Sequence, residues 1–140
     1  MILGLHATPE DVMRAVEALQ EFARARQVPE KVIFGLALAV EECGSNIVNH
    51  SLQRDPRQKF RVTIEHSQSA LTIELHDRGP EFDPTRAPVA EPALDEDDRP
   101  PGGWGIQLVR HYMDGINYRR ENGENVLRLT KQLKQTGDQE

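Results

Sequence analysis

The segment 37–51 reads ALAVEECGSNIVNHS and carries a carboxylate and an amide at helical spacing. Glu42 and Asn46 are four residues apart, so on a helix they share one face, and Asn49 joins the same flank. A carboxylate can accept a proton, and an amide oxygen is a hard ligand for a cation such as Mg²⁺. Gly44 costs a helix about 1 kcal/mol relative to alanine, which favours a close approach of another backbone or a ligand. The alternative is an ordinary solvated helix edge.

A second candidate site ends a strand in the segment 71–84, LTIELHDRGPEFDP. Alternation puts Asp77 on the same face as the apolar residues of that strand, which is the face that a sheet buries. A buried carboxylate requires a partner or a ligand. Gly79 permits a close approach or an unusual backbone angle. The alternative is a strand that ends at Leu75, with Asp77 in an ordinary turn.

Glycines precede an apolar helix in the segment 100–109, PPGGWGIQLV. Gly102, Gly103 and Gly105 stand directly before Ile106 and the residues that follow it. A glycine-rich entry to a helix exposes N–H groups at the positive end of the helix dipole, where phosphate binds. The segment matches neither the phosphate loop with Lys-Ser/Thr nor the dinucleotide fingerprint, and a flexible hinge is the alternative.

The three groups together supply what an adenine nucleotide with Mg²⁺ requires. The adenine amino group needs an acceptor, the phosphates need N–H donors, and the metal needs oxygen ligands. Their combination therefore predicts an ATP site more strongly than any one group does.

Hydrophobic periodicity predicts the elements that must position these residues. Helical spacing predicts helices over 9–26, 29–51 and 105–114, the first one capped by Thr8 with Asp11 completing a capping box. Alternation predicts strands over 2–6, 60–65, 71–76, 116–120 and 125–132. Residues 80–103 are expected to form a loop, and 134–140 a frayed tail. This order predicts an α+β two-layer sandwich with a mixed or antiparallel sheet and the helices on one face.

Composition and charge narrow the class of protein. A chain of 140 residues suits one domain, and its single cysteine, Cys43, favours a reducing compartment. No apolar run approaches the roughly 20 residues of a membrane helix, and no signal peptide begins the chain. The formal net charge of -6 disfavours direct binding to nucleic acid. We therefore expect a single cytoplasmic domain over residues 1–140 that binds neither membrane nor nucleic acid.

In this order the motifs resemble the boxes of the GHKL (Bergerat) ATP-binding fold. Residues 42–46 resemble its N box, residues 77–84 its first glycine box, residues 102–114 its second, and residues 123–131 its last strand. The best match within the fold is the stand-alone serine-protein kinase/anti-sigma factor family, and the resemblance covers residues 3–133. It implies one histidine-kinase-like ATP-binding domain with a mixed, mostly antiparallel sheet, three helices on one face and a lid over about 84–103.

The resemblance implies a role for each matching residue. Glu42 would be the general base, and Asn46 would bind Mg²⁺ through its amide oxygen. Asp77 would accept a hydrogen bond from the adenine amino group, with Gly79 beside the ring. The other ATP-binding positions that it implies are Asn49, His50, Phe82, Gly102, Gly103, Gly105, Ile106 and Thr130. Thr130, on the last strand, would lie on the adenine side.

The resemblance also implies partners, because a lone ATP-binding domain has to act on another protein. In this family the partner is a STAS-type anti-anti-sigma protein, phosphorylated on serine or threonine, or a sigma factor, and members commonly form homodimers. The expected function is an ATP-Mg-dependent serine/threonine-protein kinase and anti-sigma regulator in transcription. One alternative is a nucleotide-gated binding module without efficient kinase activity, which the acidic segment 91–101 favours. The other is an interaction domain that has lost ATP, which the intact motifs disfavour.

Overall fold

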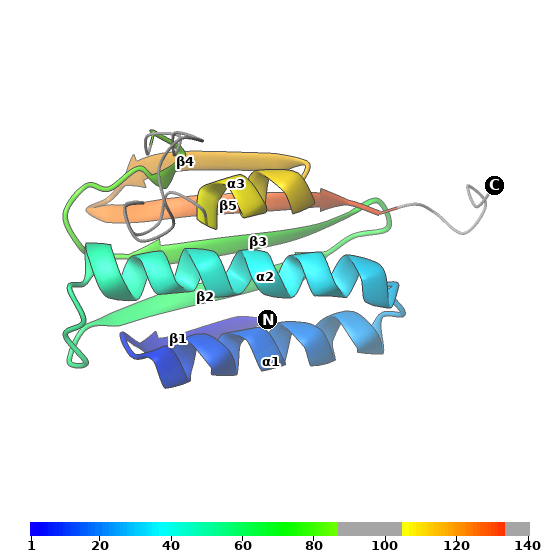
Figure 1. The fold of residues 1–140 in the computed structure, drawn as a ribbon, viewed down its shortest axis with the longest axis horizontal. Helices are drawn as coiled ribbons and strands as arrows, with labels where there is room; N and C mark the ends of the chain where they lie inside the picture. The colour runs from blue at the N-terminus through cyan, green and yellow to red at the C-terminus, as the bar shows by residue number, and fades with distance from the viewer. Residues whose placement is uncertain (87–104, 134–140) are drawn as a thin grey trace, which may run out of the picture.

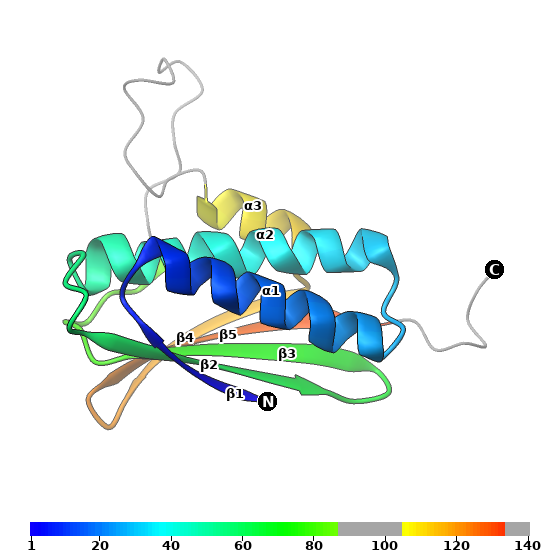
Figure 2. The same cartoon turned by 90° about the horizontal axis from the view of Figure 1, so that it is seen from below.

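Two layers make up the part of the chain that a computed structural model describes, residues 1–86 and 105–133. Three α-helices lie on one face of a five-stranded sheet (Figures 1 and 2). The elements in chain order are β1 (Ile2–His6), α1 (Pro9–Ala25), α2 (Glu30–Asn46), the π-helix η1 (Ile47–Ser51), β2 (Lys59–His66), β3 (Ala70–Asp77), the 3₁₀ turn η2 (Pro84–Arg86), α3 (Gly105–Tyr112), β4 (Gly115–Glu121) and β5 (Glu124–Gln132). The predicted α+β two-layer sandwich is confirmed.

The sheet has the strand order β1-β2-β3-β5-β4, and each of its four pairings is antiparallel. It is therefore simpler than the mixed sheet allowed for above, since no two strands of the described residues pair in parallel. β5 lies between β3 and β4, so the last strand of the described residues completes the sheet from within. Its register sets Asn125 opposite Asp77 at one end of β3 and Gln132 opposite Ala70 at the other.

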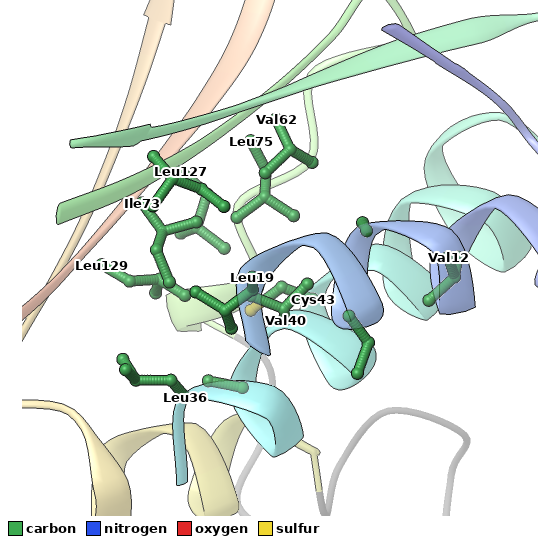
Figure 3. Packing of buried hydrophobic residues seen from close by; sticks show 14 of the residues in the cluster. Val12, Leu19, Leu36, Val40, Cys43, Val62, Ile73, Leu75, Leu127 and Leu129 are labelled. Carbon is green, nitrogen blue, oxygen red and sulfur yellow. The ribbon is translucent and has the colours of Figure 1, made fainter. Parts of the chain in front are cut away.

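The core lies between the sheet and the helices. Every second residue of β3 is buried, and this alternation continues to Asp77. Figure 3 shows Ile73 of the sheet among side chains such as Leu19 of α1 and Val40 of α2. Removing this apolar surface from water is the main favourable term in folding. The prediction that the Asp77 carboxylate faces the core side is confirmed, and the strand does not end at Leu75.

Within the helix layer α2 lies between α1 and α3, and two glycines allow the helices to approach closely (Figure 1). A Cβ on Gly44 would lie 3.2 Å from Cγ1 of Val12 in α1. A Cβ on Gly35 would lie 2.6 Å from Cδ1 of Tyr112 in α3. Helix packing thus accounts for Gly44, the glycine for which the sequence predicted a close approach.

The continuous helix Glu30–Ser51 has the length of a membrane span, with a mean hydropathy of 1.2 over its best window. We had expected no apolar run of that length. Of that window 56% is buried inside the structure, and the helix packs against α1 on one side and α3 on the other. These are the properties of the core helix of a soluble protein, so length and composition are weak evidence for a membrane segment here.

Most predicted boundaries lie within one residue of those in the structure, and two helix ends differ by more. The helix predicted over 29–51 leaves the α-helical pattern after Asn46 and continues as the π-helix η1. The helix predicted over 105–114 ends at Tyr112. Residues 84–86 of the predicted lid form η2, while 87–103 of that lid and the predicted tail 134–140 lie outside the described residues.

Candidate functional site

Asp77 ends β3 with its carboxylate in the interior, and only 3% of the residue is exposed. Its Oδ1 accepts three hydrogen bonds, from Ser51 Oγ at 2.5 Å, from the Gly79 N–H at 2.9 Å and from Asn125 Nδ2 at 3.1 Å. Its Oδ2 accepts none from residues 1–86 and 105–133. One oxygen is therefore held by the protein, and the other is available to a donor on a ligand.

A small pocket lies beside Asp77, between α2, the adjoining ends of β3 and β5, and the turn that follows β3. Its volume is about 20 Å³, room for about one water molecule. Its lining residues are Cys43, Asn46, Ile47, Leu75, Asp77, Phe82, Pro84, Tyr118, Asn125 and Leu127. Three residues predicted to bind ATP, Asn46, Asp77 and Phe82, thus surround one largely apolar cavity.

Gly79 packs directly beneath η1. A Cβ at this position would lie 2.6 Å from the main-chain oxygen of Ser51, and it would also collide with the Ser51 hydroxyl. Among the described glycines only Gly123 has a positive φ, so Gly79 is required for a close approach and not for an unusual backbone angle. The approach brings its N–H to the Asp77 carboxylate.

Asn125 is a site residue that the sequence analysis missed. It is 4% exposed, and its Nδ2 donates to Asp77 Oδ1 and, at 2.9 Å, to the Pro80 carbonyl. Its Oδ1 accepts from the Phe82 N–H at 3.1 Å and from the Tyr118 hydroxyl at 2.5 Å. The signal that could have revealed it is alternation: Asn125 shares the buried face of β5 with Leu127 and Leu129.

Ser51 is the second residue that was missed. It ends η1, is 4% exposed, and donates its hydroxyl hydrogen to Asp77. The π-helical turn is visible in the Leu52 N–H, which donates to the Ile47 carbonyl five residues back at 2.8 Å. Single π turns inside helices are rare and occur often at functional sites. The sequence pattern of residues 47–51 does not predict this π turn.

Thr130 does not lie where the resemblance implied. It pairs with Thr72 of β3, five residues along β5 from Asn125, which corresponds to about 17 Å at strand spacing. It also belongs to the strand face opposite Leu127 and Leu129. The adenine-side assignment of Thr130 is therefore wrong, and Asn125 occupies the position on β5 next to Asp77.

Asn49 and His50 separate onto two sides of η1. His50 stacks on Phe82, with ring centroids 6.0 Å apart and an interplanar angle of 15°. Asn49 is exposed, accepts a hydrogen bond from Arg54 Nε at 3.0 Å and lines a groove beside the start of α1. Because a π turn takes more residues than an α turn, it rotates Asn49 away from Asn46. The prediction that Asn49 shares the Asn46 flank is wrong.

Glu42 is half-buried on α2 at the point where α3 begins. A Cβ on Gly105 would lie 2.5 Å from Oε2 of Glu42, so glycine allows α3 to start against this carboxylate. Burial raises the pKa of Glu42, and the negative charge of Glu41 raises it further. A carboxylate with a raised pKa is a stronger base than a solvated one, as a proton acceptor requires.

In the glycine-rich segment 100–109, Ile106 belongs to the core, whereas the residues before Gly105 lie outside the described residues. Ile106 is 4% exposed and belongs to the hydrophobic core, so only its main chain is placed to meet a phosphate. Gly102 and Gly103 lie outside the described residues. The first N–H groups of α3 have no acceptor within the helix, which suits them to an anion.

The oxygen donors at this place suit Mg²⁺ bound together with a nucleotide. Asn46 lines the pocket, and Glu42 precedes it by one helical turn. No group of three or more His, Cys, Asp or Glu side chains could hold a metal in residues 1–86 and 105–133. Mg²⁺ in nucleotide sites takes one or two protein ligands and the rest from phosphates and water, so this sparse donor set fits it.

The sequence matches one family over nearly its whole length. The family model described as a histidine kinase-like ATPase domain matches residues 5–131. The chain belongs to the histidine kinase-like ATPase family. As a member of that family it is 30% identical, over 128 residues, to the serine/threonine-protein kinase BtrW of Bordetella bronchiseptica, a match that covers 91% of this chain and 90% of BtrW. The resemblance to the histidine kinase-like ATP-binding fold and to a serine-protein kinase is confirmed.

Solved structures of two proteins share the fold of this ATPase-family member. The SiaB-SiaC complex from Pseudomonas aeruginosa contains a chain with a TM-score of 0.63 and 12% identity, covering 95% of this chain and 89% of that one. The RsbU and RsbW domains of Rv1364c from Mycobacterium tuberculosis give a TM-score of 0.62 and 14% identity over 94% of this chain. This chain spans only 31% of the Rv1364c structure. Both likenesses concern the fold, which is of the GHKL type expected.

Proposed function

We propose that this ATPase-family protein is an ATP-Mg-dependent serine/threonine-protein kinase that phosphorylates a STAS-type anti-anti-sigma protein and thereby acts as an anti-sigma regulator. The observation that carries the proposal is the unused oxygen of Asp77, which borders a pocket that Asn46 also lines. Glu42 stands one helical turn before Asn46 on α2. The relative BtrW, named a serine/threonine-protein kinase, supports the reaction type.

The adenine end of the nucleotide would lie in the pocket beside Asp77. The adenine amino group donates hydrogen bonds, and Asp77 Oδ2 is an acceptor with no other partner in the described chain. Leu75, Leu127 and Ile47 give the apolar walls that a flat ring requires. At about 20 Å³ the pocket is too small for a purine, so we expect the wall formed by Phe82 to move outward on binding.

The phosphates would lie toward Glu42 and the first turn of α3. Asn46 would hold Mg²⁺ through its amide oxygen, and the metal when bound would neutralise charge on the β- and γ-phosphates. The N–H groups at the start of α3 would donate to phosphate oxygens. Gly105 leaves the space between this helix end and Glu42 clear of a side chain.

Glu42 would accept the proton of the attacking hydroxyl. As the serine or threonine oxygen bonds to the γ-phosphorus, the bond from that phosphorus to the bridging oxygen breaks and ADP leaves. The carboxylate takes the hydroxyl proton, which it can do because burial and Glu41 raise its pKa. Positioning and electrostatics supply most of the acceleration in phosphoryl transfer, so Glu42 needs correct placement more than great basicity.

Labelled ATP tests the proposal directly. The protein, Mg²⁺ and [γ-³²P]ATP are incubated with candidate STAS-domain proteins from the same organism, and label on each candidate is measured. Glu42→Ala should abolish the label and retain ATP binding, whereas Glu21→Ala, which removes an exposed carboxylate on α1, should retain both. ATP binding without transfer to any STAS or sigma candidate would favour a nucleotide-gated binding module. Absence of ATP binding would refute the proposal.

A further inference from the structure

Asp77 must hold its carboxylate in one orientation if a single oxygen is to face a ligand. The torsion that turns a carboxylate about its Cβ–Cγ bond is broad and roughly two-fold, so the side chain itself does not fix the plane. The three hydrogen bonds that Oδ1 accepts must therefore fix it. Their donors belong to three different segments of the chain, and they do not constrain the carboxylate equally.

Two of the three donors constrain the carboxylate only weakly. The Gly79 N–H belongs to the turn that Asp77 itself begins, so it moves together with that turn. Asn125 Nδ2 carries two hydrogens, yet three acceptors lie within 3.3 Å of it: Asp77 Oδ1, the Pro80 carbonyl and Ser51 Oγ. Its bond to Asp77 is therefore shared with other acceptors. Both donors also belong to the sheet or to the turn that follows β3.

Ser51 supplies the third donor, and its hydroxyl hydrogen is directed at Asp77. The hydroxyl has one hydrogen, an ionised carboxylate only accepts, and Asn125 Nδ2 already donates to Ser51 Oγ at 3.3 Å. The Ser51 hydrogen therefore points to Asp77 Oδ1, with 2.5 Å between the two oxygens. Ser51 is 4% exposed, so little water competes for this bond.

The bond from Ser51 joins the two layers of the fold. Ser51 ends η1, which continues α2 beyond Asn46, whereas Asp77 ends β3 of the sheet. The two segments touch here, because a Cβ on Gly79 would lie 2.6 Å from the main-chain oxygen of Ser51. Ser51 thus connects the strand that carries the Asp77 carboxylate with the helix that carries Glu42.

Two uncommon backbone conformations occur where Ser51 is placed. The π turn of η1 takes more residues than an α turn, so it changes the directions of the side chains from residue 47 onward. Gln53 and Arg54 then have φ angles of 53° and 60°, in the left-handed region that residues with a Cβ seldom adopt. Such conformations persist where the surrounding structure imposes them, and they are frequent at ligand sites. Their place next to Ser51 connects them with the pocket beside Asp77.

We propose that Ser51 is a positioning residue for base recognition: its hydroxyl holds the Asp77 carboxylate so that Oδ2 faces the pocket and accepts from a 6-aminopurine. This role rests on the proposed function, since it places the base beside Asp77, but it does not depend on phosphotransfer. Without the Ser51 bond the carboxylate can rotate, and Oδ2 is no longer aligned. A base with a 6-amino group then loses an acceptor, whereas a base without that group loses nothing.

Calorimetry with two triphosphates tests the role of Ser51. ATP carries the 6-amino group, and purine riboside 5′-triphosphate has a hydrogen in its place. With Mg²⁺ the wild-type chain should bind ATP at least about tenfold more tightly than the analogue. Ser51→Ala should raise the dissociation constant of ATP about tenfold and that of the analogue by no more than about twofold. A role in folding alone would weaken the binding of both to the same extent.

Three further variants separate recognition from folding. Ser67→Ala removes a hydroxyl that accepts from the Ala70 N–H at the other end of β3, so it should change neither dissociation constant. Ser51→Cys keeps an atom at the position of Oγ but donates only weakly, so it should also lose discrimination, even if Ser51→Ala does not fold. In an Asp77→Asn background, Ser51→Ala should affect the binding of both triphosphates equally.

The possible results distinguish the role of Ser51 from the proposed function. If the wild type discriminates and both Ser51 variants discriminate as well as it does, Ser51 has no such role and the proposed function stands. If the wild type binds both triphosphates alike, Asp77 does not recognise the amino group and the role of Ser51 fails with it. If the wild type binds neither, the proposed function is overturned together with the role of Ser51.

Discussion

The amide of Asn125 holds the carboxylate of Asp77 and the turn that follows it at the same time. Nδ2 donates to Asp77 Oδ1 at 3.1 Å and to the Pro80 carbonyl at 2.9 Å, while Oδ1 accepts from the Phe82 N–H. Arg120 Nη1 adds a bond to the same Oδ1 at 3.1 Å. Buried networks of this kind stabilise more than their separate pairs would, and they leave neighbouring groups unsatisfied when one member is removed.

Replacing Asn125 by leucine should therefore weaken both the fold and the nucleotide site. Leu has a similar volume but leaves the Pro80 carbonyl, the Phe82 N–H and the Tyr118 hydroxyl without the partner that Asn125 provides. We expect a loss of about 1–3 kcal/mol in the free energy of unfolding and at least about a tenfold loss in ATP affinity. Urea denaturation and calorimetry measure the two effects. Asn117→Leu, at an exposed position of β4, is the matched control and should change neither.

Asp77→Asn should separate recognition from stability. An amide oxygen in place of Oδ1 can still accept from Ser51, Gly79 and Asn125, so we expect the fold to persist. The amide NH₂ would then occupy the position of Oδ2 and present donors to the adenine amino group. We expect a loss of ATP affinity on the order of 100-fold. Unchanged affinity by calorimetry would show that Asp77 does not contact the base.

Gly105→Ala should impair phosphotransfer with little loss of stability. The added Cβ would lie 2.5 Å from the end of the Glu42 side chain, which is flexible and can move aside. A displaced base loses the alignment that proton transfer requires. The rate of transfer should fall at least about tenfold while the melting temperature changes little. Gly115→Ala is the control, because its Cβ would meet Thr130 at 3.5 Å, an ordinary contact.

The raised pKa of Glu42 makes two predictions with defined signs. The folded chain binds the Glu42 proton more tightly than the unfolded chain, whose pKa is near the ordinary 4.5. Stability from this group is therefore present at low pH and falls as pH rises from about 4.5 through the raised pKa. Glu42→Gln should be more stable than wild type near neutral pH, and the difference should vanish below about pH 4.5. Urea denaturation at several pH values tests this.

Activity should show the opposite trend, because the base works only when deprotonated. The rate of wild-type phosphotransfer should fall as pH decreases through the raised pKa. The residual rate of Glu42→Gln should lack that acidic limb. If the wild-type phosphotransfer rate does not fall at acidic pH, Glu42 is not the general base, even if its effect on stability follows the prediction above.

The rate at which a thiol reagent labels Cys43 should show whether nucleotide occupies the pocket beside Asp77. It lines the cavity beside Asp77, and burial raises the pKa of its thiol to about 12. Reaction with a thiol reagent at neutral pH should therefore require opening of the structure. ATP-Mg²⁺ should slow the labelling at least about tenfold, provided that the nucleotide occupies this pocket. Equal labelling rates with and without saturating nucleotide would contradict the proposal that adenine binds in the pocket lined by Cys43.

Much of the fold was predictable because burial imposes a period on the sequence. The alternation in β3 and the helical spacing of α1 gave elements that the structure confirms. The cap was also predicted: Thr8 Oγ1 accepts from the Asp11 N–H at 3.1 Å. The second bond of the predicted capping box is absent, because the Asp11 carboxylate accepts from the His6 N–H and not from the Thr8 N–H. A single chain segment does not reveal which neighbouring N–H lies nearer in space.

The site was less predictable, since its composition depends on pairing between distant segments. Asn125 meets Asp77 only through the β3–β5 register, which joins residues 48 positions apart. Alternation along β5 would have excluded Thr130, whose side chain lies on the face away from Leu127. The placement of Ser51 depends on a π turn that no propensity in 47–51 specifies. The residue types thus indicated the chemistry of the site, whereas the contacts between distant segments determine which residues form it.

The position of β5 also has a consequence for synthesis on the ribosome. β3 and β4 are both made before β5, yet β5 lies between them and pairs with each. Until residues 124–132 emerge, the nascent chain exposes the unpaired edge of β3 together with its buried face. The sheet can close only after residues 124–132 have left the ribosome, so the unpaired edge of β3 requires protection from aggregation until then.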